Sequence, residues 1–406
     1  MTTGYDILIV GGGMVGASLA SALAGHGLRI AVVEAVPFGT EAQPSYDDRA
    51  IALSYGTRRI FEGMGVWPAL ATQAAPIREI RVSDRGRFGA ARLRAADAGT
   101  DALGYVAEAR VLGRALIARL AGQADIDVFC PATLEDLAFE PDAARARVRA
   151  GERADELRCR LVVAADGAHS AVRERLAIPT TRWEYGQTAV IANVTPAWHH
   201  RGVAYERFTG GGPLAVLPMR DERCAVVWTL RAEQAQSVLA LDDQAFLARL
   251  QDYFGYRLGA LRRVGRRHAY TLSLVRAREH VRPRLALIGN AVHTLHPVAG
   301  QGFNLGLRDV AALAQVLVQA VEHACDLGDL VVLKEYAAWR RRDHQHVTVF
   351  TDGLARLFAN PLAPVGLARD LGLLAVDLLP PLKRMLLRQT MGLAGTLPRL
   401  ARGLPL

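Results

Sequence analysis

Lysine is almost missing from this chain of 406 residues, since only Lys334 and Lys383 stand among its 49 basic residues. The rest are arginines, and with 40 acidic residues the formal net charge is +9. Codon bias in a GC-rich genome would explain the preference for arginine. The alternative is attraction to an anionic surface, where lipid headgroups fit better than nucleic acid. No basic run is interleaved with aromatics as in single-strand binding, so we expect no nucleic-acid partner.

Cysteine is also scarce, and its pattern excludes several kinds of site. No C-x-x-C pair occurs, and no histidine lies at metal-ligand spacing from a cysteine. The sequence therefore predicts no dithiol redox centre, no structural zinc, no disulfide framework and no metal site. The four scattered cysteines are Cys130, Cys159, Cys224 and Cys325.

Long uncharged apolar runs are absent too. No stretch of about 20 residues lacks both charge and proline, so a membrane-spanning helix is not expected. A buried-strand pattern begins by Tyr5, which leaves no room for a signal peptide and predicts a cytoplasmic protein. The hydrophobic content of 51% and the length predict a large core in two or three structural units.

The N-terminus carries a nucleotide-binding pattern. An apolar run over residues 5–10 leads into Gly11-Gly12-Gly13-Met14-Val15-Gly16, which fits G-x-G-x-x-G, and then into a helix rich in small residues. A second strand ends in Glu34, which can accept hydrogen bonds from ribose hydroxyls. Gly11 permits the turn, Gly13 lets the backbone approach a pyrophosphate, and Gly16 allows close helix–strand packing. This unit predicts dinucleotide binding but does not separate FAD from NAD.

Three further stretches offer polar groups to such a ligand. Arg49 precedes an apparent helix and could reach a pyrophosphate or flavin edge, or simply be a helix-start arginine. Arg110 opens another amphipathic helix with the same two alternatives. Asp166-Gly167 ends an apolar strand, where α/β sheets bind ligands, although a plain Asp-Gly turn would look the same.

A second glycine-rich loop lies almost 290 residues downstream. A strand over residues 284–290 delivers Asn290, and His296 to Asp309 follow as HPVAGQGFNLGLRD. The glycines and Pro297 suit a loop that passes close to a flat ligand. Apolar spacing predicts a helix from Asn304 to Val321, and its start would supply unpaired N–H groups and partial positive charge to an anionic flavin edge.

Between these segments the chain lacks βαβ rhythm. Residues 71–100 and 181–275 instead contain short apolar strands broken by Gly and Pro, which predict an antiparallel sheet covering the cofactor and forming a substrate pocket. A discontinuous nucleotide-binding domain would then comprise 1–70, 101–180 and 276–350. No second G-x-G-x-x-G on a strand–helix frame occurs, so a second dinucleotide would bind only transiently.

In their order along the chain, these motifs resemble those of the flavoprotein aromatic hydroxylases (class A monooxygenases). Within them the chain is similar to the ubiquinone-biosynthesis hydroxylases, on RVSDRG (81–86), VVAADGAHSA (162–171), AVIANV (189–194) and residues 205–219 and 288–310. The resemblance implies an α/β, FAD-binding Rossmann-type fold with an interleaved antiparallel sheet and a helical C-terminus. Asn290 stands where the wider superfamily has Asp, and we interpret it as a feature of the subfamily.

The resemblance also implies the chemistry. NADH or NADPH would reduce FAD, O2 would add at flavin C4a, and the hydroperoxide would hydroxylate a polyprenylated phenol, namely 2-polyprenyl-6-methoxyphenol. The alternatives are another ring position in the same pathway, or a flavin-dependent reductase that does not use O2. A ubiquinone-biosynthesis protein complex is an expected partner.

The same resemblance assigns residues to the cofactor. No catalytic base is visible, and His293, His296 and Tyr205 are the candidates for polarising a phenol; each could equally be a packed polar group. The expected cofactor-binding set is Gly11, Gly13, Met14, Val15, Gly16, Glu34, Arg49, Arg110, Asp166, Gly167, Asn290, Pro297, Gly300, Gln301, Gly302, Phe303 and Asn304.

The C-terminal region, residues 351–406, changes in texture. From residue 356 it carries seven basic residues against two acidic ones, and its leucines recur at helical spacing with Pro breaks. It is either a helical cap packed on the domain or a basic amphipathic surface that meets a membrane or a partner. The second interpretation would make the protein peripheral to the inner membrane.

Overall fold

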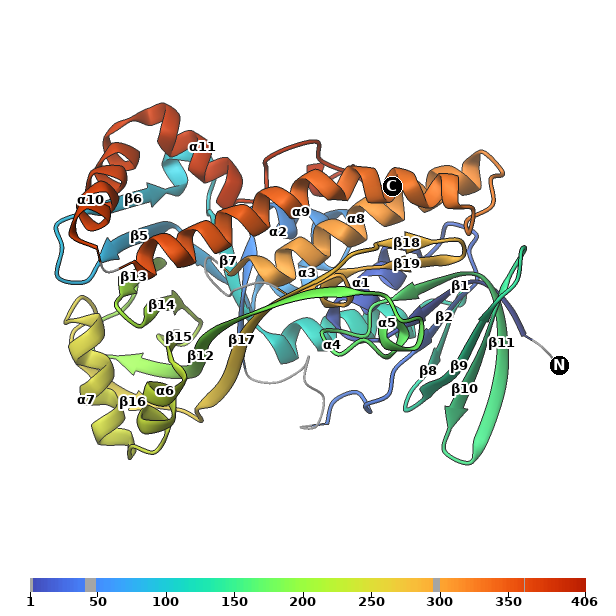
Figure 1. The fold of residues 1–406 in the computed structure, drawn as a ribbon, viewed down its shortest axis with the longest axis horizontal. Coiled ribbons are helices and arrows are strands. Elements are labelled where there is room, and N and C mark those ends of the chain that lie inside the picture. The colour runs from blue at the N-terminus through green and yellow to red at the C-terminus, as the bar shows by residue number, and fades with distance from the viewer. Residues whose placement is uncertain (1–2, 41–48, 295–299, 361) are drawn as a thin grey trace.

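The N-terminal apolar run forms the central strand of a parallel sheet (Figure 1). Strand β1 (Thr3–Val10) lies between β2 (Ile30–Val33) and β11 (Arg153–Ala164). Parallel pairing continues to β8 (Ile126–Phe129) beside β2, and to β19 (Leu285–Leu287) beside β11. Because β1 has later strands on both sides, the strand order reverses at its carboxyl end, the usual ligand position in open α/β sheets. The computed structural model describes residues 3–40, 49–294, 300–360 and 362–406.

The two halves of strand β11 differ in their pairing partners and in their burial. Its first half alternates exposed and covered residues and pairs with β10 (Ala144–Ala150), which pairs with β9 (Thr133–Phe139). Its last four residues are fully buried beside β1. Strand β18 (Val281–Arg282) closes the far edge of the sheet. The continuous apolar end of β11 is thus the part that lies in the parallel sheet.

Helices α1 (Met14–Leu23), α4 (Ala109–Ala121) and α8 (Gln301–Glu322) share one hydrophobic core with this sheet. The helix predicted from Asn304 begins three residues earlier, because Gly300 adopts a left-handed conformation (φ 59°) and serves as its N-cap. The remaining short helices of this half are α2 (Tyr55–Gly63), α3 (Trp67–Ala71), α5 (Ala171–Arg175) and the 3-10 turns η1 (Ala95–Ala98), η2 (Gly289–Ala291) and η4 (Leu400–Arg402).

A small antiparallel sheet joins the two halves of the molecule. It is made of β3 (Ala50–Ser54), β7 (Gly104–Glu108) and β4 (Ala75–Ile77). The predicted substrate sheet includes residues 75–77, but in the structure these residues pair with β7 of the small sheet. There the apolar side chain of Ile77 packs between the small and large sheets.

The large sheet is mostly antiparallel, as the resemblance predicts. One pair, β5 with β13, is parallel, since these strands come from separate segments and not from a hairpin. Helices α6 (Ala232–Leu239) and α7 (Asp243–Phe254) cover one face. The strands in spatial order are β20 (His293–Thr294), β17 (His268–Ala277), β12 (Thr180–Pro196), β15 (Cys224–Arg231), β14 (Gly212–Pro218), β13 (Val203–Thr209), β5 (Glu79–Asp84) and β6 (Ala90–Arg94), with β16 (Leu261–Val264) beside β12.

The C-terminal part is helical, as predicted. Helix α9 (Leu330–Ala359) runs through the expected boundary at residue 350 and reaches from the parallel sheet to the large sheet (Figure 1). Helix α10 (Ala363–Leu378) then packs on β5 and β6, and α11 (Pro380–Thr390) lies against α10 and η1. Within the described residues, none of the helices combines the length and apolarity needed to cross a membrane.

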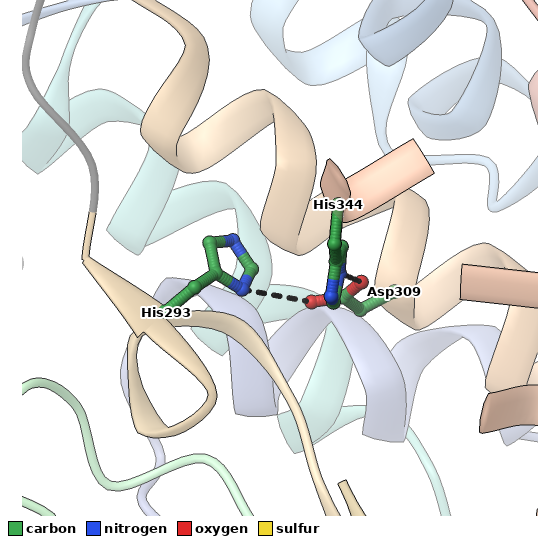
Figure 2. Close-up of side chains that lie close together, drawn as sticks. All are labelled: His293, Asp309 and His344. Carbon is green, nitrogen blue, oxygen red and sulfur yellow. Dashed lines mark hydrogen bonds and ion pairs between the residues drawn. The ribbon is translucent and has the colours of Figure 1, made fainter. Parts of the chain in front are cut away.

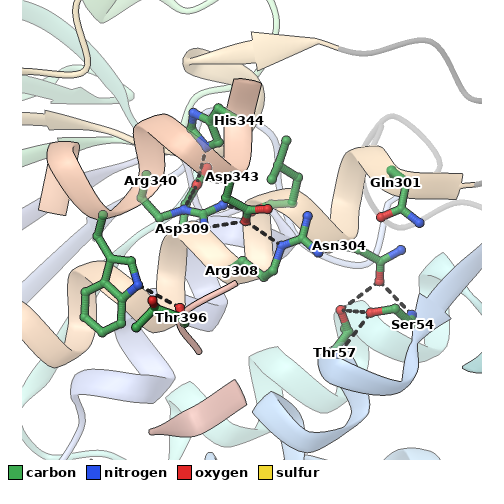
Figure 3. A network of polar contacts seen from close by, with 12 residues as sticks. Ser54, Thr57, Gln301, Asn304, Arg308, Asp309, Arg340, Asp343, His344 and Thr396 are labelled. Atoms are coloured by element: carbon green, nitrogen blue, oxygen red, sulfur yellow. Dashed lines mark hydrogen bonds and ion pairs between the residues drawn. The ribbon is translucent and has the colours of Figure 1, made fainter. Parts of the chain in front are cut away.

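A buried ion-pair network fastens α8 to α9 (Figure 3). The Asp309 carboxylate on α8 is fully buried and accepts hydrogen bonds from Arg340 Nε (2.7 Å) and His344 Nε2 (2.6 Å), both on α9. Its other oxygen accepts from the Gly289 backbone N–H (3.1 Å). Burial opposes ionisation, but His344 and Arg340 outweigh it and hold the pKa of Asp309 well below its usual range.

We expect Asp309→Asn to lower the free energy of unfolding by about 3–5 kcal/mol at pH 7, because the buried Arg340 loses its counter-charge. The folded-state pKa of Asp309 is depressed, so its contribution is present above the pKa of the unfolded chain and is lost as the pH falls. Denaturant titrations between pH 7 and pH 2 would measure both effects. The control is Asp252→Asn, which removes an exposed pair with Arg85 and should cost less than about 1 kcal/mol. Equal losses in the two variants would contradict the prediction.

Candidate functional site

The N-terminal glycine loop packs too closely for side chains. Gly11 has φ +103°, and a Cβ atom there would lie 2.6 Å from the Ala165 carbonyl carbon. A Cβ atom on Gly16 would lie 1.9 Å from the Gly11 carbonyl oxygen. Helix α1 begins after Gly13, which makes no side-chain cap, and Met14 and Val15 form its first turn. The turn therefore presents backbone N–H groups that suit a phosphate.

Glu34 braces this loop from the end of β2. Its carboxylate accepts hydrogen bonds from the backbone N–H groups of Gly12 (2.7 Å) and Val36 (2.9 Å). A carboxylate offers about four acceptor positions, so these bonds leave capacity for a ribose hydroxyl. The residue predicted for the ribose thus also fixes the loop that would hold the pyrophosphate.

Asp166 lies at the neighbouring strand end and has an unused oxygen. Its Oδ2 accepts from the Val172 N–H (3.1 Å), whereas Oδ1 is buried and has no hydrogen-bond partner among the described residues. Burial raises the pKa of this carboxyl above its usual value. Gly167 follows with φ 81°. A buried acceptor without a partner requires a ligand or water, so the site fits a hydroxyl-bearing cofactor.

The second glycine loop spans the two halves of the molecule. It leaves from β20, where His293 and Thr294 pair with Arg276 and Val275 at the edge of the large sheet. It returns at Gly300, where an added Cβ would lie 3.0 Å from the Ala52 side chain on β3. Two predicted residues of the loop, His296 and Pro297, lie outside the described residues.

Asn304 joins α8 to β3 with all of its amide capacity (Figure 3). Its Oδ1 accepts from the Ser54 N–H (2.8 Å) and the Thr57 hydroxyl (2.7 Å). Its Nδ2 donates to the carbonyls of Ala52 (2.9 Å) and Gly300 (2.7 Å). The sequence predicted a direct cofactor contact, but these four bonds make Asn304 a residue that positions the loop.

The other residues of this loop differ in their surroundings. An added Cβ on Gly302 would meet nothing within 4 Å, so open space lies in front of it. Gln301 is buried and donates from Nε2 to the Thr390 carbonyl (3.4 Å), and Phe303 lies beside Phe61. Asn290, in the turn η2, is exposed. Asn290 in η2 and Gly302 in the first turn of α8 are therefore the accessible residues of this set.

The two predicted arginines lie at the same end of the small sheet, where the Ala109 N–H donates to the Arg49 carbonyl (2.8 Å). Arg49 comes directly before strand β3, where the sequence suggested a helix start, and its guanidinium lies over the Tyr270 ring of the large sheet, 4.9 Å from the centroid. Arg110 does open a helix, α4, and its Nε donates to Glu108 (2.6 Å). Arg49 thus sits between the small and large sheets.

The two described candidates for the base are packed away from the large sheet's open face. His293 is buried, its Nδ1 lies 3.9 Å from Asp309, and burial lowers its pKa to about 3 (Figure 2). Tyr205 packs edge-on against Phe254 of α7, on the helix-covered face. Both residues thus occupy packed positions, in keeping with the alternative that each is a packed polar group.

His293, Asp309 and His344 are close enough together to suggest a metal site, with ligand atoms within 4.8 Å of one another (Figure 2). However, Asp309 already accepts hydrogen bonds from Arg340 and His344. The Arg340 guanidinium 2.7 Å from the same carboxylate would repel a divalent cation. The group is therefore a structural ion-pair network.

A row of partly exposed side chains crosses the other face of the large sheet. Strand pairing places its members side by side on five neighbouring strands, and none of them is fully buried. The rows on either side are covered: Ala204 packs toward the small sheet, and Phe208 stacks on Phe358 of α9. This central row consists of Val82, Glu206, Ala215, Val227 and Ile191.

Sequence reasoning missed Glu206 and chose its neighbour Tyr205. Side chains alternate along a strand, so Glu206 lies on the face opposite Tyr205. Glu206 is a half-buried acidic residue on a row that is otherwise apolar. The strand alternation in AYERF was the available signal, but the sequence did not reveal which face was covered by α7.

Comparison with known proteins gives a consistent answer. The FAD binding domain family matches residues 4–351. The chain is 42% identical over 404 residues to ubiquinone hydroxylase UbiL of Rhodospirillum rubrum, covering 99% of this chain and 93% of that protein. It is 35% identical to 3-demethoxyubiquinol 3-hydroxylase of Escherichia coli, covering 96% and 98%. Among solved structures, p-nitrophenol 4-monooxygenase PnpA from Pseudomonas putida DLL-E4 shares the fold, with a TM-score of 0.81, 20% identity and coverage of 97% and 99%.

These matches confirm the family and the cofactor that the sequence predicted. FAD fits the close glycine loop and the unused oxygen of Asp166 described above. The relatives named here are hydroxylases or monooxygenases, and none of them favours the alternative of a reductase that does not use O2. The chain belongs to the FAD-dependent hydroxylases of ubiquinone biosynthesis.

Proposed function

We propose that the protein hydroxylates the ring of 2-polyprenyl-6-methoxyphenol, using O2 and NADH or NADPH. The observation that carries this proposal is the central row, an apolar and partly exposed strip opposite the small sheet. Such a strip can hold an aromatic ring and the start of a prenyl chain, because burying apolar surface stabilises the complex by roughly 25 cal/mol per Å². Bound FAD, once reduced, supplies the activated oxygen for the ring.

The protein's own groups orient and shield this chemistry. Glu34, Asp166 and the N–H groups after Gly11 would bind the adenosine, ribitol and phosphate parts of FAD. The backbone at Gly300 and Gly302 would meet the isoalloxazine edge, and Asn304 keeps that backbone in place through β3. Arg49, over Tyr270, would close the space between the sheets to water.

The decisive test is a product analysis under ¹⁸O2. We expect the FAD-loaded protein with NADH or NADPH and 2-geranyl-6-methoxyphenol to form a product with one ¹⁸O atom, detected by mass spectrometry. A ring hydroxylation at another position is the second candidate, favoured by the 35% identity to the E. coli 3-hydroxylase. Turnover of a demethoxyubiquinol analogue alone would select that candidate, and absence of ¹⁸O from every product would overturn both.

We expect Asp166→Ala to weaken FAD binding roughly tenfold to 100-fold, because a hydrogen bond to a charged group contributes about 1.5–3 kcal/mol. The melting temperature of the apo protein should change little, because removal of the unpartnered Oδ1 is offset by loss of the bond from the Val172 N–H to Oδ2. Fluorescence titration with FAD and thermal melts would measure the two effects. Asp142→Ala, at an exposed carboxylate, is the control. Unchanged FAD affinity in the Asp166 variant would contradict its assigned role.

The C-terminal helices supply a second part of the proposal, a peripheral contact with an anionic membrane. Leu367, Leu371 and Leu378 of α10 are 51–72% exposed and recur on one helical face, and Met385 of α11 is 67% exposed. Exposed Arg384 and Arg388 accompany them. Apolar side chains flanked by arginines match a bilayer surface with anionic headgroups. A ubiquinone-biosynthesis protein is the other candidate occupant.

Vesicle flotation would test this contact. Wild-type protein should bind vesicles of one part phosphatidylglycerol to three parts phosphatidylethanolamine, and the double variant Leu378→Gln/Met385→Gln should bind more than tenfold more weakly, because each buried apolar side chain contributes about 1.5–3 kcal/mol. The control is Val331→Gln, which changes an apolar residue of α9 that is 68% exposed. Equal binding of the two variants, or no binding by the wild type, would exclude the membrane contact.

A further inference from the structure

Glu206 occupies a distinctive place on the large sheet. It lies on β13 between Ala215 of β14 and Val82 of β5, both of which point to the same face. This is the face turned toward the small sheet and α9, opposite to that covered by α6 and α7. The side chain is only partly exposed, and its neighbours in the central row are hydrocarbon. A carboxylate in such surroundings is poorly solvated.

Glu206 also lacks a partner. Across the described residues no hydrogen bond or ion pair involves its carboxylate, and burial alone raises its pKa to about 7. The charged groups on the elements around this end of the sheet are engaged with one another. Asp84 of β5 pairs with Arg369 and Arg87, and Asp370 of α10 pairs with Arg87; on α9, Asp352 pairs with Arg356 and accepts from Tyr185.

A partly buried carboxylate without a counter-charge destabilises the folded protein, since its desolvation is not repaid by any bond. Such a group is explained by a ligand that supplies the missing donor. The proposed function puts an aromatic ring on this strip, and a phenol hydroxyl is a donor. We propose that Glu206 contacts the phenol hydroxyl of the substrate and acts as the general base for ring hydroxylation. This inference rests on the proposed function and adds the base that the sequence did not reveal.

The Glu206 carboxylate takes the proton of the phenol O–H, and the electron pair of that bond stays on the phenol oxygen and enriches the ring. The ring carbon gains one oxygen atom of O2 as a hydroxyl group, and the other oxygen leaves as water; NADH or NADPH supplies two electrons as hydride, and solvent supplies the protons that this reduction needs. The ring C–H proton is then released to solvent, and the protonated carboxyl returns its proton to the phenol oxygen. A carboxyl that titrates near neutral pH suits this exchange.

The first experiment tests the isolated carboxylate without using turnover. A folded-state pKa that is raised above the unfolded value gives stability at low pH that is lost as the pH rises through about 7. Glu206→Gln should therefore melt at a higher temperature than the wild type at pH 8, and the difference should shrink at pH 5. The control is Glu233→Gln, an exposed glutamate on α6. A difference that does not change with pH would show that Glu206 is not isolated.

The second experiment tests the base. Glu206→Gln should still bind FAD, but form hydroxylated 2-geranyl-6-methoxyphenol about 100-fold more slowly. The wild-type kcat/KM should rise with pH through about 7, the rise should disappear in Glu206→Gln, and Glu206→Asp should restore it. Glu233→Gln should behave as the wild type.

The outcomes separate the two proposals. If the wild type hydroxylates the phenol and Glu206→Gln keeps its rate and pH profile, Glu206 is not the base while the proposed function stands. If the wild type forms no hydroxylated phenol, the proposed function is wrong. The assignment of Glu206 as the base is then wrong as well, whatever the melting experiment gives.

Discussion

The carboxylate of Asp309 is the point on which the arrangement of the cofactor half depends. It binds two cationic or hydrogen-bonding groups of α9 and the backbone of Gly289, and thereby fixes α8, α9 and the end of strand β19 to one another. Because the group is fully buried, each bond must be present for the charge to be tolerated. Of the second glycine loop, the described end at Gly300 leads into α8, one of the helices that this carboxylate holds.

Asn304 links the fixed position of α8 in the core to the interface between the small and large sheets. One helical turn before Asp309, it joins α8 to β3, and the small sheet containing β3 packs against the large sheet. The same helix thus positions the loop for the flavin and the wall that faces the substrate. A change at either residue would alter the spacing between cofactor and ring without touching either, and that spacing governs transfer of an oxygen atom.

The substrate side follows a different principle. Rows that pack on the small sheet or on α9 are covered, and the central row between them keeps accessible apolar surface. The carboxylate of Glu206 on that row has no partner within the described part of the protein, and it therefore lowers the stability of the folded protein. The phenol hydroxyl of the proposed substrate would supply the missing hydrogen-bond donor. The exposed leucines of α10 and α11, close to the β5–β6 edge of the same sheet, would bring an apolar substrate near this site.

The sequence by itself determined the parallel sheet, both glycine loops, the helical C-terminus and the family, because glycine conformation and continuous apolar strands depend on local chemistry. It also marked Asp166 and Glu34, since a strand end places a side chain at the ligand edge. It could not assign Tyr205, His293, Glu206 or the role of Asn304. The face to which a side chain points, and the partner that it meets, depend on which element packs on that face. Helix α7 covers Tyr205, and the network around Asp309 surrounds His293. Glu206 lies on a row that neither the small sheet nor α9 covers fully.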